Sequence, residues 1–142
     1  MTRAASLGMY ELPWLIEATD ALWAELRPAL RAANVAGVPD ALDRSRPLAA
    51  LWRDPALLLG QACGYPLVTE LAGAVQVVAT PVYAFPGCAG PMHRSFVLVR
   101  ADDPAPSLAA LRGRRCALNG RDSNTGMNLL RALVAPLAQN QP

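Results

Sequence analysis

Short apolar runs separated by segments of helical spacing constrain the fold of this chain more than any other feature. The runs are rich in Ala, Leu and Val, and they occupy residues 4–9, 56–59, 75–79, 96–99 and 116–118. Helical spacing is clearest at residues 15–30 and 127–137, with shorter candidates at 47–54, 66–71 and 107–111. Strands that alternate with helices predict an α/β fold with a largely parallel sheet, because parallel strands need a crossover connection.

Proline and tryptophan positions refine these expectations. Pro28 lies inside the first long helical pattern, and its missing N–H predicts a kink or a split there. Trp14, Trp23 and Trp52 fall on helical faces, so we expect all three in the core. The chain is 53% hydrophobic and 17% charged, which is typical of a globular protein with a sizeable core.

Charge, cysteine spacing and the lack of lysine exclude several classes of function. The net charge of +2 is too small for a nucleic-acid-binding footprint, and no apolar run is long enough for a membrane helix. Cys63, Cys88 and Cys116 lack the spacing and the His partners of a zinc site. We therefore expect no metal and no cofactor, while a single disulfide between Cys63 and Cys88 stays open. A Walker A loop is excluded because it requires Lys.

The stretch at residues 114–127 combines a short strand, a polar turn and the start of a helix. Ser123, Asn124 and Thr125 are residue types that cap helix N-termini. Free N–H groups and the helix dipole favour an anion there, so the turn is a candidate oxyanion site, with simple N-capping as the alternative. Ligands of parallel sheets bind beyond the carboxyl ends of strands. That rule adds further residues to a possible crevice: Met9, Tyr10, residues 61–63, Tyr83 and Asn119.

Four segments, taken in order, resemble the phosphate/phosphonate-type substrate-binding proteins of ABC transporters. They are residues 6–10 (SLGMY), 57–64 (LLLGQACG), 93–99 (HRSFVLV) and 107–126 (SLAALRGRRCALNGRDSNTG). The last segment ends in a Ser-x-Thr-Gly turn, which is similar to the family's Ser-x-Ser-Gly turn. The resemblance implies the two-lobed type 2 periplasmic-binding-protein fold. Residues 1–92 would form the first α/β lobe, and residues 93–142 the crossover and a partial second lobe.

The resemblance also implies which residues of the turn bind the ligand. Ser123 and Thr125, together with the amide of Gly126, would hold the ligand's anionic head at the helix N-terminus. Asn124 stands between the two hydroxyl residues, and Asn119 would lie near the end of the returning strand. The chain departs from the family pattern at Thr125, which replaces the second Ser.

Three further residues complete the implied ligand site. Gln61 would face the ligand from the first lobe, at a position where better-known phosphonate binders often carry Tyr. Tyr10 is the best aromatic candidate for the ligand, although packing is the ordinary role of an aromatic side chain at a strand end. His93 begins the segment that crosses into the second lobe.

The function implied by the resemblance is that of a solute-binding protein, not an enzyme. It would capture a small anionic ligand such as phosphate or phosphonate and pass it to an ABC permease. One alternative is a cytoplasmic ligand-sensing module of the same fold. Another is a hydrolase or transferase that uses Cys88 or Ser123, with His93 as a base.

Location and assembly follow from the same resemblance. Proteins of this family are periplasmic, whereas the sequence given carries no secretory leader, which favours the cytoplasmic alternative. We expect a truncated second lobe that self-associates through uncovered apolar surface. Neither a nucleic-acid partner nor direct membrane insertion is expected.

Overall fold

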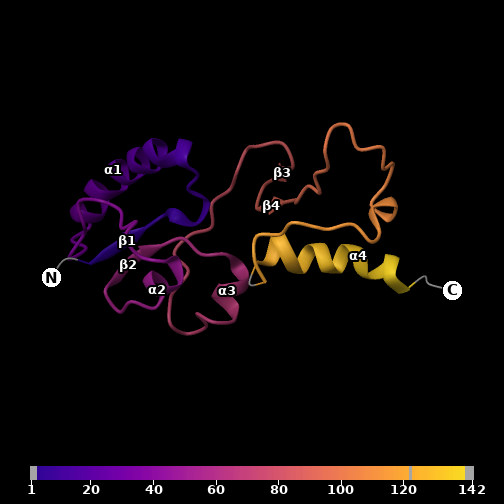
Figure 1. Cartoon of the computed structure of the whole chain (residues 1–142). Coiled ribbons are helices and arrows are strands. Elements are labelled where there is room, and N and C mark those ends of the chain that lie inside the picture. The colour runs from indigo at the N-terminus through magenta and orange to yellow at the C-terminus, as the bar shows by residue number, and fades with distance from the viewer. Residues whose placement is uncertain (1–2, 122, 140–142) are drawn as a thin grey trace. The chain divides into compact units, whose positions relative to one another are not determined.

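The computed structural model describes residues 3–121 and 123–139 (Figure 1). Contacts divide the chain into two units, Met1–Val75 and Gln76–Pro142, and each is described by itself. The division lies before residue 92, where the lobe boundary is predicted, and the assignment of lobes remains a prediction. The described residues form a small mixed α/β protein with a two-stranded parallel sheet and four α-helices. The predicted α/β class is therefore confirmed, whereas the two-lobed fold stays a prediction.

The first unit is built on the parallel pair of β1 (Ala4–Ser6) and β2 (Leu57–Gly60). The connection between these strands contains the 3₁₀ turns η1 (Gly8–Tyr10) and η2 (Pro13–Leu15), then α1 (Ile16–Ala32) and α2 (Leu48–Trp52). The strands predicted at 4–9 and 56–59 are confirmed, although β1 is shorter than predicted. The last residues of the predicted strand lie in η1 instead, and this turn leads the chain from the end of β1 toward α1.

The core of the first unit joins α1 to the sheet. Trp23 of α1 exposes only 2% of its surface and clusters with Ala5 of β1 and with Val38 and Leu42 from the following loop. Partly buried side chains of β2 pack against this cluster. The prediction that Trp23 belongs to the core is confirmed, and this contact anchors the long helix on the sheet.

The structure corrects two expectations about the first long helix, one of them in part. Trp14 is 75% exposed, because it lies in η2 before α1 begins and so does not follow the helical face of Trp23. Of the kink or split predicted at Pro28, the split is absent, because the helix runs continuously from Ile16 to Ala32. Pro28 is exposed, so water can satisfy the carbonyl group that its missing N–H leaves without a helical partner.

The remaining helices of the first unit are short. The helix predicted at 47–54 is present as α2, where Leu51 is almost fully buried. The helix predicted at 66–71 is present as α3 (Gly64–Val68), and it begins earlier than predicted. A turn then leads to Leu71, which is also almost fully buried. These two leucines fix the short helices to the rest of the unit.

The strand predicted at residues 75–79 is wrong. No described residue pairs with this segment in a sheet, and Val77 and Val78 are exposed. Its β-branched sequence favours an extended chain, but strand propensity is expressed only where a neighbouring strand and a packing face are present. The segment therefore serves as an extended connection after Val75.

The second unit contains a hairpin that the sequence did not predict. β3 (Cys88–Ala89) pairs antiparallel with β4 (Met92–His93) across a turn containing Gly90 and Pro91. Gly87 precedes β3 with φ at 90°, and a Cβ at this position would lie 2.9 Å from the ring of Phe96. Only glycine combines this backbone conformation with such a close approach.

Helix α4 (Leu129–Gln139) is the longest element of the second unit. It continues from a π-helical turn, η4 (Asn124–Asn128), and confirms the helix predicted at 127–137. Of the helix predicted at 107–111, only the 3₁₀ turn η3 (Ala109–Leu111) is present. None of the described helices combines the length and the apolar character needed to cross a membrane.

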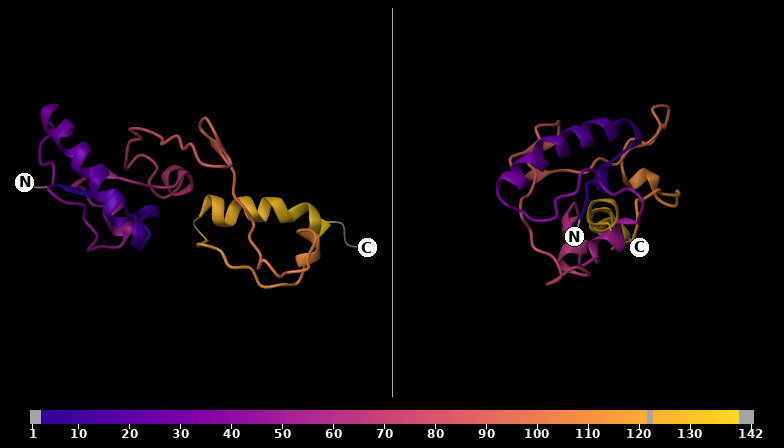
Figure 2. Two further views of the ribbon diagram at one scale, coloured as in Figure 1. Left: turned by 90° about the horizontal axis from the view of Figure 1, so that it is seen from above. Right: turned by 90° about the vertical axis from the view of Figure 1, so that its left-hand side faces the viewer.

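The strands predicted at 96–99 and 116–118 are wrong as elements of a sheet. Within the described part of the chain both segments belong to no ladder. Figures 1 and 2 show the chain between η3 and η4 running alongside α4. Both segments have residues that favour strands, but neither has a neighbouring strand to pair with among the described residues.

Candidate functional site

The candidate oxyanion turn lies where η4 begins. The Ser123 hydroxyl oxygen accepts a hydrogen bond from the Gly126 amide at 3.0 Å. The Ser123 carbonyl oxygen accepts from the amides of Met127 and Asn128, both at 3.2 Å, which produces the wide π-helical turn. Simple N-capping is therefore present, and Ser123 is the capping residue.

Asn119 belongs to the same turn in space. A Cβ on Gly126 would clash with Asn119 Oδ1 and would lie 2.9 Å from Ser123 Oγ. Glycine at this position thus lets two polar side chains approach the backbone of the first helical turn. Asn119 is predicted near the end of a returning strand at 116–118, and that segment joins no sheet among the described residues.

Donor groups remain at the turn after capping. Among residues 3–121 and 123–139, none accepts a hydrogen bond from the amides of Asn124 and Thr125, and none bonds to the Thr125 hydroxyl. Asp122 lies outside the described residues. Two amides and one hydroxyl at the positive end of the helix dipole therefore have no acceptor among the described residues.

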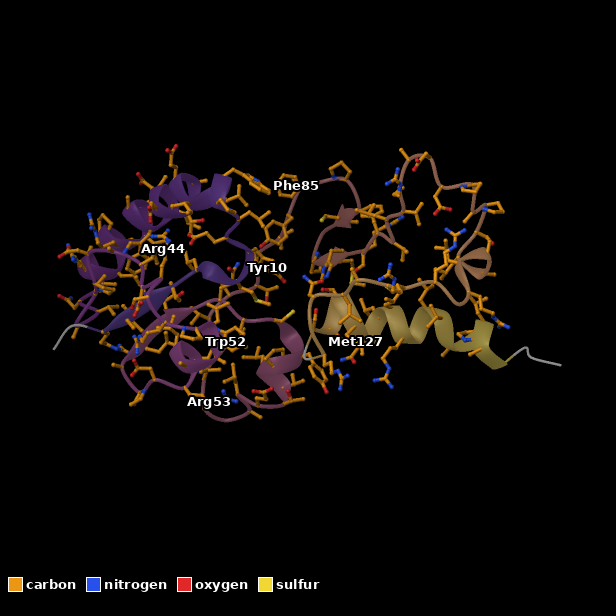
Figure 3. The ribbon with its side chains drawn as sticks, in the orientation of Figure 1. Tyr10, Arg44, Trp52, Arg53, Phe85 and Met127 are labelled. Atoms are coloured by element: carbon orange, nitrogen blue, oxygen red, sulfur yellow. The ribbon has the colours of Figure 1, made fainter. Side chains whose placement is uncertain are left out.

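The carboxyl ends of β1 and β2 bring together a second set of predicted residues within the first unit. The Tyr10 hydroxyl lies 3.9 Å from Cys63 Sγ. The backbone N–H of Gln61 donates to the Ser6 carbonyl at 3.2 Å, and the backbone carbonyl of Gln61 accepts from Trp52 Nε1 at 3.0 Å. Figure 3 shows Tyr10 and Trp52 in this unit. Trp52 is half-buried, and its hydrogen bond to Gln61 holds the backbone just after β2.

The side chain of Gln61 is the most unusual group of this strand-end cluster. Its Oε1 atom is buried, and no described residue donates a hydrogen bond to it. A buried amide oxygen without a donor is costly, so the position favours a ligand or water that supplies an N–H or O–H. This is the property expected of a residue that faces a polar ligand.

The predicted ligand residues are divided between the two units. Tyr10 and Gln61 lie in the first unit, whereas His93, Asn119 and the turn at 123–126 lie in the second. Each group is brought together within its own unit, and the joint site remains a prediction. Tyr83 stacks on Phe85 with ring centres 6.1 Å apart, so in this structure it serves packing.

An arginine cluster at the end of β1 was missed by sequence reasoning. Arg44 forms a bidentate pair with Glu11, with both bonds at 2.7 Å, and also bonds to Asp20 at 2.8 Å. Hydrogen bonding to Arg44 lowers the pKa of Glu11, and the two carboxylates raise the pKa of Arg44. Arg44 lies in an aperiodic loop between helices, where no local pattern marks it.

This cluster borders a small pocket of about 170 Å³. Its lining includes Ser6, Gly8 and Arg46 in addition to Arg44 and Glu11. Charges of opposite sign are already matched here, since Arg46 bonds to carboxylates in the same way. The cluster consequently acts first as a clamp on the loop after β1.

The possible nucleophile–base pair is placed by the hairpin. Cys88 of β3 and His93 of β4 are directly opposite one another in the antiparallel register. No described residue hydrogen bonds to either side chain, so the pair lacks the third group that orients a catalytic base.

Cys63, Cys88 and Cys116 are all free thiols, so the Cys63–Cys88 disulfide is not formed. No metal-binding group of His, Cys, Asp and Glu occurs among the described residues.

Comparison with known proteins gives no relative. The chain matches no protein-family model, no curated protein and no solved structure.

Proposed function

We propose that this chain is a solute-binding module that holds a small oxyanion, such as phosphate or a phosphonate, at the turn formed by residues 123–126. The observation that carries this proposal is the set of donors left after Ser123 caps the helix. The amides of Asn124 and Thr125 and the Thr125 hydroxyl have no acceptor among the described residues. Charge-assisted hydrogen bonds of this kind are roughly twice as strong as neutral ones.

Glycine and asparagine support the same function. Gly126 leaves the backbone open to close approach, as its contacts with Asn119 and Ser123 indicate. The Asn119 side-chain amide can orient a bound ligand or donate a hydrogen bond to it. An oxyanion would then receive hydrogen bonds from the helix amides, a hydroxyl group and an amide side chain.

We propose that the chain belongs to a two-lobed protein of the type 2 periplasmic-binding-protein fold. In this proposal the strand-end cluster of Tyr10 and Gln61 faces the ligand from the first lobe, and hinge closure brings the lobes together. The orphan oxygen of Gln61 suits a protonated phosphate or phosphonate, whose O–H can donate to it. Delivery to an ABC permease is the proposed role, and ligand sensing in the cytoplasm would use the same site with a different partner.

A titration with inorganic phosphate tests the oxyanion site. We expect the amide NMR signals of Asn124 and Thr125 to shift with a millimolar dissociation constant, about −4 kcal/mol of binding free energy, because the turn is open to water. Replacing Ser123 and Thr125 together by Ala should weaken binding by roughly 2–4 kcal/mol, which amounts to loss of the titration.

A matched control separates the site from general effects of substitution. The Ser107 hydroxyl oxygen, just before η3 in the same unit, accepts from the Ala110 amide at 3.4 Å, so Ser107→Ala removes a similar hydroxyl elsewhere. It should leave phosphate binding unchanged. Unchanged shifts in the Ser123/Thr125 double variant, or equal shifts with chloride at the same ionic strength, would refute the assignment.

Thiol chemistry is the second candidate, because the hairpin places Cys88 directly opposite His93. If His93 activates the thiol, iodoacetamide at neutral pH should modify Cys88 faster than Cys116, and His93→Ala should abolish the difference. Equal reactivity of the two thiols, read by mass spectrometry of the peptides, would leave the binding function as the only one supported.

A further inference from the structure

The last residue of β1 carries a buried hydroxyl group that has no partner in the described part of the chain. Ser6 exposes only 4% of its surface, and none of residues 3–121 and 123–139 hydrogen bonds to its Oγ atom. Buried polar groups are normally satisfied by the protein, by water or by a ligand, because leaving one unpaired is costly. The Ser6 hydroxyl therefore requires a polar molecule beside it.

This residue lies on the wall of the pocket of about 170 Å³ that Arg44 also lines. Gly8 and Leu48 line the same pocket, and a Cβ on Gly8 would lie 3.7 Å from Ser6 Oγ and 3.6 Å from Leu48 Cδ2. Glycine thus leaves room beside both side chains. The pocket is at the carboxyl end of β1, the end of a strand at which α/β sheets bind ligands. Sites for drug-sized ligands measure roughly 300–1,000 Å³, so this pocket suits a molecule of few atoms.

Arg44 keeps hydrogen-bond donors after its ion pairs have formed. Its Nε and Nη2 atoms donate to Glu11 and Asp20, and no described residue accepts a hydrogen bond from its Nη1 atom. A guanidinium group has only donors, whereas an ionised carboxylate has about four acceptor sites, of which Arg44 fills two on Glu11. The pocket therefore offers donors and acceptors side by side.

The charges around the pocket disfavour an ion as its ligand. Arg44 and Arg46 each bond to two carboxylates, so two positive groups stand against four negative ones, which are Glu11, Asp20, Asp43 and Asp54. This excess of negative charge repels an anion. A cation finds few acceptors, because each oxygen of Asp43 already accepts two hydrogen bonds. A neutral molecule leaves every ion pair intact.

We propose that this pocket binds a small uncharged polyol through two adjacent hydroxyl groups. A hydroxyl group both donates and accepts, so a vicinal pair accepts from Arg44 Nη1 and donates to Glu11 while it also bonds to the Ser6 hydroxyl. The carbon atoms of the polyol contact Leu48. All of these residues belong to the first unit, whereas the oxyanion turn belongs to the second. Either site can therefore fail its test without affecting the other.

An NMR titration of the full chain with erythritol tests the pocket. We expect the amide signals of Ser6 and Gly8 to shift with a millimolar dissociation constant, because so small a ligand makes few contacts. Butane-1,4-diol has the same four carbon atoms without adjacent hydroxyl groups. It should bind at least about tenfold more weakly, since it loses a hydrogen bond to a charged group.

Two variants test the residues without disturbing the ion pairs. Ser6→Ala should weaken erythritol binding about tenfold and leave folding intact, because no described residue uses the hydroxyl group. Gly8→Ala should abolish binding by placing a methyl group beside Ser6 Oγ. Gly64→Ala is its matched control, because a Cβ there meets nothing within 4 Å. Neither glycine has a positive φ, so alanine is tolerated at both positions. Circular dichroism should show the same helix content in all three variants.

Several outcomes would overturn the proposal. Signals of Ser6 and Gly8 that do not respond to erythritol would mean that the pocket holds water only. Equal affinity for butane-1,4-diol, or unchanged binding in Ser6→Ala or Gly8→Ala, would exclude the vicinal hydroxyl contacts. An equal loss in Gly64→Ala would assign the effect to the added methyl group in general. Larger shifts of the same signals with phosphate or methylammonium would assign the pocket to an ion.

Discussion

The two units carry similar apolar runs but use them differently. In the first unit, β1 and β2 pair with each other and bury Trp23 beneath α1. In the second, the runs at 96–99 and 116–118 join no ladder, and none of the described residues of that unit is fully buried. A segment with strand-like sequence forms a strand only where another strand lies beside it to pair with. The first unit supplies that partner within itself, whereas the described residues of the second unit do not.

Charges differ between the units in the same sense. Arg44 and Arg46 of the first unit each engage two carboxylates, and the pairs of Arg44 join residues 24 and 33 positions apart. The pairs of the second unit are more local, such as Arg100 with Asp102. Arg94, Arg115 and Arg131 have no ion pair with described residues there. The second unit is thus the one with free cationic groups for an anionic ligand or a partner.

The largest expected effect comes from the buried tryptophan of the first unit. Trp23→Ala should lower the free energy of unfolding by about 3–5 kcal/mol, because it removes the side chain that joins α1 to the sheet. Trp14→Ala is the matched control and should cost less than about 0.5 kcal/mol, since Trp14 is exposed. Urea unfolding followed by circular dichroism measures both. Equal losses of unfolding free energy in the two variants would show that the core of the first unit is not centred on Trp23.

The next effect concerns the clamp formed by Arg44. Glu11 exposes only 9% of its side chain, so Arg44→Met leaves a nearly buried carboxylate without its partner. We expect a loss of about 2 kcal/mol. Arg53 offers the control, because it pairs with Glu70 at 2.5 Å while both side chains remain about half exposed. Arg53→Met should cost at most about 1 kcal/mol. Arg44 and Arg53 are both marked in Figure 3, and a similar loss in both variants would contradict a special role for Arg44.

Acid should weaken the first unit through the same carboxylates. Hydrogen bonds from Arg44 lower the pKa of Glu11, and those from Ser45 and Arg46 lower the pKa of Asp43. Because the unfolded chain binds protons more readily than the folded one, this stabilisation is complete above the unfolded pKa near 4. It is lost as the pH falls through the lower folded pKa values. Urea midpoints between pH 7 and pH 2 should show this loss, and Arg44→Met should make it smaller. A variant with an undiminished acid effect would exclude Glu11 as a source.

Sequence reasoning predicted the elements that are specified locally. The spacing of Leu22, Trp23, Leu26 and Leu30 is strong enough to predict α1, and the run at 56–59 predicts β2. The capping role of Ser123 was one of two readings left open, and its hydroxyl does cap the helix. Each of these features depends on residues within a few positions of one another.

The features that were missed depend on distant partners. Strand sequence at 75–79 carries no information on whether another strand lies beside it, and none does among the described residues. Trp14 has the same periodicity as a core residue, but the helix begins two residues later, at Ile16. Arg44 reaches Glu11 across 33 positions, and Gln61 is exceptional only because its oxygen is buried without a donor. Burial and long-range pairing are properties of the folded chain, not of a local pattern.

The smallest effect tests how the second unit holds its helix. Ser123→Ala removes the hydroxyl that accepts from the Gly126 amide, and loss of such a cap costs about 1 kcal/mol. Because the second unit buries little, we expect this loss to appear as local opening of the first turns of α4. Hydrogen exchange should therefore quicken about fivefold at the amides of residues 126–132, while the amides of α1 serve as an internal reference and stay unchanged. Ser107→Ala, whose bond to Ala110 is longer at 3.4 Å, should change exchange only around η3. If α4 exchanges equally fast before and after Ser123→Ala, the cap does not hold the turn, and the donors of Asn124 and Thr125 are not preorganised for an anion.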